Sequence, residues 1–311
     1  MPAGRAGAPP PPARRKSRKL ASPKQRGERR RPRDARPPTS GAALPLDFAP
    51  GQRILVVGDG DLSFSAALAS LLHAADAAAT AAAKRGDDEA EQPPAAAPSV
   101  LVATSYDTLP ILHEKYASAA ASVAALEALG CCVGCGVDAT DLARSLKALR
   151  RRVTAAATAA DADASQPLVV PLCFDRVVFA FPHLGTDLAD QARAVAAHQE
   201  LLALFFRSSV SVLAPRGRVV VALKTGLPYG LWNAPRCASS GTGGSLALRT
   251  SHAFDAAAFP GYRHRRTRGD AASEPTEAAL AGGARAYVWQ RTEEAEAALA
   301  AAAVSTGGVT V

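Results

Sequence analysis

The sequence predicts an α/β fold: a doubly wound, mostly parallel sheet with helices on both faces. Two observations predict it. Short apolar runs alternate with segments of helical periodicity, in the order β-α-β-α-β-α-β-α-β. Glycines and polar side chains stand where the apolar runs end. Because ligands bind outside the carboxyl ends of the strands in such sheets, we expect a site at that edge.

The first strand and the turn after it are the clearest element. Ile54–Val57 is apolar throughout, as expected of a strand buried on both faces. Gly58 and Gly60 end the strand, and Asp61 can cap a helix that follows. The apolar face of that helix is predicted to carry Phe64, Leu68 and Leu71. The free N–H groups of such a turn can bind a ligand, but GDGD alone also fits a tight turn without one.

Two further strand–helix units follow. The second strand is predicted at Val100–Thr104 and leads to Asp107, and the third is predicted at Cys132–Val137 and leads to Asp138. The helix after the third strand is predicted over 140–153. One helix is expected between the two strands, with the apolar residues and terminal glycine Leu112, Tyr116, Val123, Leu126 and Gly130.

The fourth and fifth strands complete the predicted order. Phe174–Phe179 is a strand that runs into the segment Ala180–His183. The next helix is expected to end at Pro215–Gly217, and Arg218–Leu223 is the fifth strand, followed by Lys224–Tyr229. The apolar side of that helix is predicted to carry Leu201, Leu202, Phe205 and Val212.

Several side chains at these strand ends have chemistry suited to a ligand. Asp107 can accept hydrogen bonds from both ribose hydroxyls of a nucleoside, although a loop or cap acid is equally common. Asp138 could contact an adenine amino group, cap the next helix, or do both. Phe181 offers a flat surface for a base, and Pro182 stiffens its loop. His183 could accept or relay a proton near neutral pH, although a lone loop histidine is more often structural.

The basic character of the chain is concentrated at its start. The 311 residues carry a net charge of +8, but residues 1–40 alone carry +11 from ten Arg and three Lys against one Glu and one Asp, which leaves −3 for the rest. This Pro/Arg-rich segment has no apolar periodicity and is predicted to be a disordered arm for nucleic acid or nuclear import. We therefore expect a location in the nucleus or nucleolus, with an organelle-targeting peptide as the alternative.

Composition also sets the expected boundaries. We expect a disordered tail over 1–48, a domain over 49–292 and an Ala/Gly-rich C-terminal tail over 293–311. Two alanine-rich segments, about 74–98 and 154–166, are expected to be exposed insertions in the domain.

Cysteine and apolar patterns exclude other classes of protein. Five cysteines, an odd number, fit a reducing compartment. Cys131, Cys132 and Cys135 lack a second Cys or His pair, so buried thiols are expected and no metal site is predicted. No uninterrupted run of about 18 strongly apolar residues is present, so association with a membrane is not expected.

Seven ordered motifs resemble the large-subunit rRNA (uridine-N3) methyltransferase-like domain family. They lie within roughly 53–288 and read VVGDGDLSFSAALA, LVATSYD, VDAT, FDRVVFAFPHLG, QELLALFFRSS, LKTGLPYGLW and FPGYRHRRT. The resemblance implies a Rossmann-like class I methyltransferase with a seven-stranded sheet, in which Ala286–Gln290 is a candidate late strand. It also implies S-adenosyl-L-methionine as cofactor and rRNA or a pre-ribosomal particle as partner. We expect a monomer.

The resemblance further implies roles for individual residues. The residues that bind the cofactor would be Gly58, Asp59, Gly60, Asp61, Ser63, Asp107 and Asp138. The catalytic residues, which face the target base, would be Phe181, Pro182 and His183. The residues that contact RNA would be Lys224, Tyr229, Trp232, Arg263, Arg265 and Arg266, with a solvated charged loop as the alternative for the arginines.

The chain departs from the family pattern at a few positions. Ala180 and His198 each stand where the family usually has Asn, Asp59 replaces a more usual Glu, and Leu62 replaces a more usual Phe. The amide missing at Ala180 would be expected to bind the base or the cofactor carboxylate. Weak activity, another RNA or a small molecule as substrate, or a cofactor- or RNA-binding module without activity therefore remain alternatives.

Overall fold

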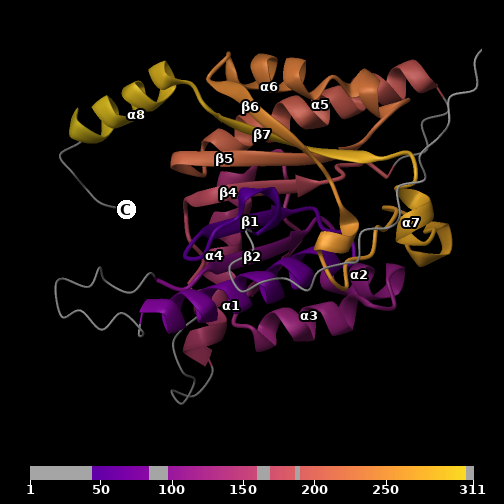
Figure 1. Ribbon diagram of the computed structural model, residues 1–311, viewed down its shortest axis with the longest axis horizontal. Coiled ribbons are helices and arrows are strands. Elements are labelled where there is room, and N and C mark those ends of the chain that lie inside the picture. Colours follow the sequence, from indigo (N-terminus) through magenta and orange to yellow (C-terminus); the bar gives the residue numbers. More distant parts are fainter. Residues whose placement is uncertain (1–43, 84–96, 160–168, 186–189, 306–311) are drawn as a thin grey trace, which may run out of the picture. The chain divides into compact units, whose positions relative to one another are not determined.

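A seven-stranded sheet forms the centre of the part of the chain that the computed structural model describes, residues 44–83, 97–159, 169–185 and 190–305 (Figure 1). Strands β1 to β5 are parallel, and β7 is antiparallel to both of its neighbours, β5 and β6. This confirms the predicted doubly wound, mostly parallel sheet. In their order across the sheet the strands are β3 (Cys132–Cys135), β2 (Val100–Ser105), β1 (Arg53–Val57), β4 (Phe174–Ala180), β5 (Leu213–Lys224), β7 (Ala284–Arg291) and β6 (Leu246–Ala253).

The order of the strands reverses between β1 and β4. From β1 the chain moves outward to β2 and β3, then returns to β4 on the other side of β1 and continues outward. Connections that leave the two central strands in opposite directions open a crevice at the carboxyl edge of the sheet. The topology therefore places a ligand-binding crevice where the glycine turn after β1 meets the loop after β4.

Helices cover both faces of the sheet because successive strand residues point to opposite sides. Ile54 and Val56 pack with α1 (Ser63–Ala83), α2 (Leu109–Lys115) and α3 (Ala119–Ala128), which lie along the lower part of Figure 1. Leu55 and Val57 pack with the opposite layer, formed by α4 (Leu142–Ala159), α5 (Gln191–Val210) and α6 (Ala234–Thr242). All four side chains are fully buried.

The prediction of a single helix between the second and third strands is wrong, because the chain forms two helices there, α2 and α3. The break follows from Tyr116, which ends α2 and turns its side chain inward, where its hydroxyl donates to the carbonyl oxygen of Arg266 (2.9 Å). A contact between residues 150 positions apart thus outweighs the local helical preference. Gly130 ends α3 as predicted, with a left-handed φ of +70°.

Alanine-rich stretches that were predicted as exposed insertions or a tail are partly helical. Helix α1 continues to Ala83 and α4 continues to Ala159, both within the predicted insertions, and Glu293–Ser305 in the predicted tail forms α8. Alanine has the highest helix propensity, so such runs extend a helix even where they bury little surface. The remainder of these segments lies outside the described residues.

Helix α1 is, within the described residues, the one helix long and apolar enough to cross a membrane by length and composition. That is weak evidence for a span, because core helices pass the same test. Phe64, Leu68 and Leu72 of α1 are buried against the sheet. Phe64 and Leu68 were predicted for this face, whereas Leu71, the third predicted residue, is only partly buried.

Further details differ from the prediction, among them the third strand, which ends at Cys135 and not at Val137, and the helix after it, which spans Leu142–Ala159 and not 140–153. Helix α5 ends at Val210, and Pro215–Gly217 lies inside β5, where the pairing with β4 shifts register after Phe174. Strand β6 was not predicted. The folded part includes residues 44–48 of the predicted tail, because Leu46 and Phe48 are buried in the core.

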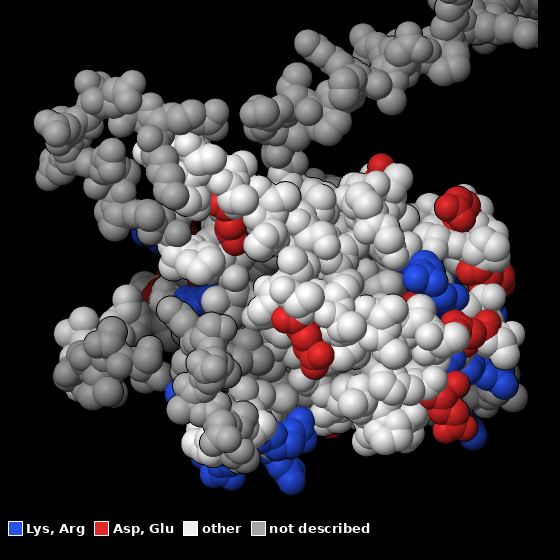
Figure 2. All heavy atoms as spheres, turned by 90° about the horizontal axis from the view of Figure 1, so that it is seen from below, with Lys and Arg blue, Asp and Glu red and all other residues white. Residues whose placement is uncertain are grey.

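The face covered by α1 and α3 is mostly uncharged. Figure 2 shows this face with few Lys, Arg, Asp or Glu side chains at its centre and most of the charged ones near its edges. The exposed part of α1 and most of α3 are alanine, which explains the pattern. The described part of this face therefore has no continuous basic surface for a polyanion.

Candidate functional site

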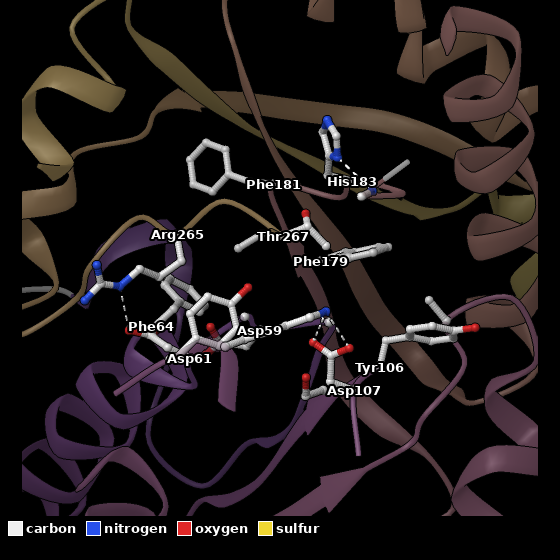
Figure 3. A pocket seen from close by; sticks show the side chains of 18 of the residues that line it. Asp59, Asp61, Phe64, Tyr106, Asp107, Phe179, Phe181, His183, Arg265 and Thr267 are labelled. Carbon is white, nitrogen blue, oxygen red and sulfur yellow. Dashed lines mark hydrogen bonds and ion pairs between the residues drawn. The ribbon is translucent and has the colours of Figure 1, made fainter. Parts of the chain in front are cut away.

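A cavity of about 550 Å³ opens at the carboxyl ends of β1, β2, β3 and β4 (Figure 3). Its volume lies within the range of small-molecule and cofactor sites. Six of the seven residues predicted to bind a cofactor line this cavity, and Ser63 is the exception. The six residues follow the ends of the neighbouring strands β1, β2 and β3. The segment 262–267, which follows β6 in the chain, forms the remaining wall, and it is anchored by a hydrogen bond from the Arg263 N–H to Ser63 Oγ (3.0 Å).

The glycine turn after β1 has no room for side chains. Gly58 adopts a φ of +64°, and a Cβ at this position would lie 2.7 Å from Cε2 of Phe179. A Cβ on Gly60 would lie 3.3 Å from the Tyr116 hydroxyl. The backbone of this turn therefore forms the cavity floor and leaves its space to a ligand.

Asp59 and Asp61 are buried carboxylates with different surroundings. Asp59 accepts hydrogen bonds from the N–H and hydroxyl of Ser65 (both 2.7 Å), at the start of α1. Burial, and next the charge of Asp61, raise the pKa of Asp59 to about 7. Asp61 accepts from the Ser63 N–H (3.0 Å), as predicted for a cap, and pairs with Arg265 Nε (3.0 Å). The turn thus holds one carboxyl that titrates near neutral pH and one that is paired with a guanidinium.

Asp107 and Asp138, which follow β2 and β3, each accept hydrogen bonds from residues of this chain. Lys115 of α2 donates to both carboxylate oxygens of Asp107 (2.8 and 2.9 Å). Asp138 accepts from the Thr140 N–H and hydroxyl (2.8 and 2.7 Å) through Oδ1. Asp138 was predicted to cap a helix from Thr140, but α4 begins at Leu142, so Asp138 stabilises the turn before the helix and Asp141 accepts from the Arg144 N–H (3.4 Å). Both carboxylates, of Asp107 and Asp138, line the cavity.

The segment after β4 forms a wall between two cavities. Phe181 has a left-handed φ of +57°, uncommon for a residue other than glycine and frequent at functional sites. Its ring meets those of Phe254 and His264 edge-on, with centroids 5.0 and 4.6 Å away. Pro182 is buried behind it, and His183 is exposed, with Nδ1 accepting the Gly185 N–H (3.0 Å).

A second cavity of about 530 Å³ lies on the other side of this wall. Five of the six residues predicted to contact RNA line it: Lys224, Tyr229, Trp232, Arg265 and Arg266. Lys224 Nζ lies 5.8 Å from the centre of the Tyr229 ring, and Trp232 stacks on His198 at 4.1 Å. The two cavities share Phe181, His183, His264, Arg265 and Thr267.

The arginines of the predicted RNA-binding cluster have different partners. Arg265 pairs with Asp61 and with Asp270 (3.2 Å), and its side chain is only 18% exposed. Arg266 pairs with Glu274 at the surface. Arg263 contributes its backbone to the contact with Ser63 and lines the first cavity. Arg265 therefore holds the segment 262–267 over the glycine turn.

Several residues of the site were not predicted from the sequence. They are Lys115, Tyr116, Tyr262 and Thr267, and all of them line the first cavity, as does His264, which belongs to the basic cluster predicted to contact RNA. His264 is buried, so its pKa is lowered to about 4, first by burial and then by Lys224 and Arg266. The motif FPGYRHRRT was a usable signal for Tyr262, His264 and Thr267, whereas nothing in the local pattern distinguishes Lys115.

Two of the four departures from the family pattern, Ala180 and His198, lie on either side of the wall. Ala180 lines the first cavity, and His198, 5% exposed, lines the second. Of the clustered cysteines, Cys131 and Cys132 are buried as predicted, and burial raises the pKa of each to about 11. The described residues contain no group of three or more His, Cys, Asp or Glu that could hold a metal ion.

The chain is similar to proteins from plants and yeast. It is 28% identical over 229 residues to heavy metal-associated isoprenylated plant protein 41 of Arabidopsis thaliana, which covers 73% of this chain and 35% of that protein. It is 25% identical to an uncharacterized protein of the same plant, over 73% of this chain and 88% of that one. It is 27% identical to the 25S rRNA (uridine(2634)-N(3))-methyltransferase of Saccharomyces cerevisiae, over 37% of this chain and 42% of that one. The chain thus spans about a third of the first relative and under half of the yeast enzyme.

A family model agrees with the motifs and with the sheet. The model described as BMT5-like, rRNA (uridine-N3-)-methyltransferase BTM5-like, matches residues 55–266. The match includes the glycine turn, both aspartates after β2 and β3, and the wall after β4. The seven-stranded sheet, with β7 antiparallel between β5 and β6, agrees with the seven strands that the resemblance implied. The chain belongs to the BMT5-like family of rRNA (uridine-N3) methyltransferases.

Proposed function

We propose that this protein transfers a methyl group from S-adenosylmethionine to N3 of a uridine in large-subunit rRNA. The observation that carries the proposal is the wall formed by Phe181 and His183, which separates a cofactor-sized cavity from a second cavity with basic and aromatic lining. A donor on one side and a base on the other would meet at this wall. Methyl transfer is an in-line displacement, so alignment of the two is the main contribution of the protein.

The first cavity fits the cofactor. Gly58 and Gly60 leave backbone space that a Cβ would fill, which suits the methionine part of the molecule. Asp107 would accept from the ribose hydroxyls while it remains paired with Lys115, and Asp138 would accept from the adenine amino group through its second oxygen. When bound, S-adenosylmethionine supplies an electrophilic methyl group on a sulfonium sulfur, which keeps the bonding electron pair.

The second cavity suits an unpaired pyrimidine. Uridine N3 lies on the Watson–Crick face and is blocked in a duplex, so the target must be single-stranded or turned out of its stack. Phe181 and Tyr229 offer aromatic surfaces, and Lys224 offers a positive charge. N3 must also lose its proton, and Asp59 and His183 are the titratable groups on the cofactor side that could take it.

RNA binding would extend from the mouth of the second cavity. Lys224 and Arg266 line the second cavity and Arg263 lines the first, so these three side chains would supply positive charge to the RNA. The basic segment 1–40 would add further positive charge to the protein. Arg265 is not part of this proposal because it is committed to Asp61 and Asp270. The partner would be rRNA within a pre-ribosomal particle, bound by a monomer in the nucleus or nucleolus.

Ala180 supports a second candidate function. It presents no hydrogen-bonding side chain where the family's usual amide would face the cofactor cavity, which favours a cofactor- or RNA-binding module with little activity. Both functions predict a thermal shift with S-adenosylhomocysteine. The two functions are distinguished by incubating the purified protein with labelled cofactor and with pre-ribosomal particles from cells that lack this protein. An enzyme forms 3-methyluridine in the particles, whereas a binding module forms none.

A further inference from the structure

Two imidazole rings hold the loop that follows Pro182. The Gly185 N–H donates to Nδ1 of His183 at 3.0 Å, and the Leu184 N–H donates to Nε2 of His198 at 3.4 Å. A backbone N–H can only donate, so each of these ring nitrogens must carry a lone pair. The loop geometry thereby determines which nitrogen of each ring is protonated.

The two rings carry their protons on opposite nitrogens. In His198, Nδ1 lies 2.7 Å from the carbonyl oxygen of Ala194 and donates to it, which agrees with an accepting Nε2. In His183, Nδ1 accepts, so the proton of the neutral ring is on Nε2. Within the described residues Nε2 of His183 makes no hydrogen bond, and Figure 3 shows that nitrogen at the tip of the ring, away from the dashed contact.

Positive charge on His183 is disfavoured by its surroundings. A proton on Nδ1 would place two donors face to face at the Gly185 contact. Partial burial, and then His198, Lys224 and Arg266, lower the pKa of His183 below its ordinary value. The buried His264 lines the same two cavities and stays neutral as well. At neutral pH the exposed nitrogen of His183 is therefore a hydrogen-bond donor and not a proton acceptor.

We propose that His183 donates a hydrogen bond from Nε2 to O4 of the target uracil and stabilises the anion that forms when N3 loses its proton. The inference rests on the proposed function and gives His183 a role other than that of base. The N3 proton leaves to water, and the charge left behind spreads over N3, O2 and O4. Methyl transfer to N3 then neutralises it. His183 and Lys224 both line the cavity in which this charge develops.

The same donor would make the site selective for uracil. Next to N3, uracil carries the acceptor O4, whereas cytosine carries an amino group that can only donate. A donor fixed at Nε2 by the Gly185 contact would meet this amino group donor to donor. The hydrogen bond would be lost and two donors would face each other, so cytidine at the target position should be methylated at least roughly tenfold more slowly.

Two substitutions separate a donor from a base. In His183→Asn the amide oxygen can take the place of Nδ1 and keep the Gly185 contact, but nothing replaces Nε2. In His183→Gln the longer amide brings an N–H donor close to the position of Nε2. Neither variant has an imidazole that could act as a base.

The experiment measures single-turnover formation of 3-methyluridine in pre-ribosomal particles from cells lacking the protein, from about pH 6 to about pH 9. A donor that stabilises the anion lowers the pH at which N3 ionises, so His183→Asn should shift the rising limb of the profile upward by about one to two pH units while the rate at high pH recovers. His183→Gln should lie close to the wild type. A loss of rate in both variants at every pH, with no shift, would overturn the inference in favour of a base.

A second readout does not depend on activity. Long-range ¹H–¹⁵N NMR of the free protein distinguishes protonated from unprotonated ring nitrogens, and we expect the His183 ring to be neutral with its proton on Nε2. A proton on Nδ1 at neutral pH would refute the proposal. If the wild-type protein forms no 3-methyluridine at any pH, the proposed function fails and this inference fails with it, whereas an unshifted His183→Asn profile refutes the inference alone.

Discussion

Replacing Asp59 with asparagine should stabilise the ligand-free protein, and the gain should depend on pH. Burial and the charge of Asp61 raise the pKa of Asp59 from 3.8 to about 7. The folded state therefore holds the proton more tightly than the unfolded chain does. As the pH rises from about 4 to about 7, the unfolded chain loses this proton first, and the free energy of unfolding falls. Stability from this group is fully present at low pH and is lost by neutrality.

The size of the effect follows from the shift. Each pKa unit corresponds to about 1.36 kcal/mol, so a rise from 3.8 to about 7 amounts to about 4 kcal/mol. The asparagine side chain does not titrate, and its amide oxygen can still accept from the N–H and hydroxyl of Ser65. The difference in unfolding free energy between Asp59→Asn and the wild type should thus grow from near zero at about pH 4 to at most about 4 kcal/mol above pH 7.

The assay is urea unfolding at several pH values, with Asp61→Asn as the matched control. Asp61 is 1% exposed and paired with Arg265, so its replacement leaves a partly buried guanidinium with one partner fewer and should destabilise by about 2–4 kcal/mol at neutral pH. The two aspartates of one turn are thus expected to respond with opposite signs. A difference for Asp59→Asn that stays constant between about pH 4 and about pH 8 would refute the reasoning.

Three further predictions concern the stability of the glycine turn, the binding of the cofactor and the binding of RNA. Gly58→Ala should destabilise the folded protein by more than the roughly 1–2 kcal/mol that a left-handed φ costs an alanine, because its Cβ would also collide with Phe179. Gly130→Ala is the control: a Cβ there has no atom within 4 Å, so thermal unfolding should show the backbone cost alone. Asp107→Asn should weaken S-adenosylhomocysteine binding about tenfold or more in calorimetry, and an unchanged affinity would exclude Asp107 from the cofactor site. Replacing Arg263 and Arg266 together by alanine should reduce the slope of RNA affinity against salt by about two, while equal slopes would mean that neither contacts phosphate.

The parts of the fold that depend on local pattern were predictable. Ile54–Val57 and Phe174–Phe179 are apolar runs short enough for strands, and both lie at the centre of the sheet. The carboxyl ends of parallel strands meet at one edge, so Asp59, Asp107 and Asp138 line one cavity although they are far apart in the chain.

The remainder depends on contacts between distant residues. Arg265 pairs with Asp61 across 204 positions, and this ion pair turns a predicted RNA contact into a support for the glycine turn. The break between α2 and α3 follows from Tyr116, whose partner belongs to the segment after β6. The alanine-rich segments illustrate another limit: low complexity predicts an exposed segment but not its local structure, and the high helix propensity of alanine extends α1 to Ala83.

The most direct test of the central claim is nucleoside mass spectrometry of large-subunit rRNA from cells with and without this protein. Cells supply the natural substrate even if it is a precursor particle. The account predicts that 3-methyluridine in this rRNA is lost without the protein and is restored by the wild type but not by a variant unable to bind the cofactor. An unchanged level of 3-methyluridine would contradict the proposed activity.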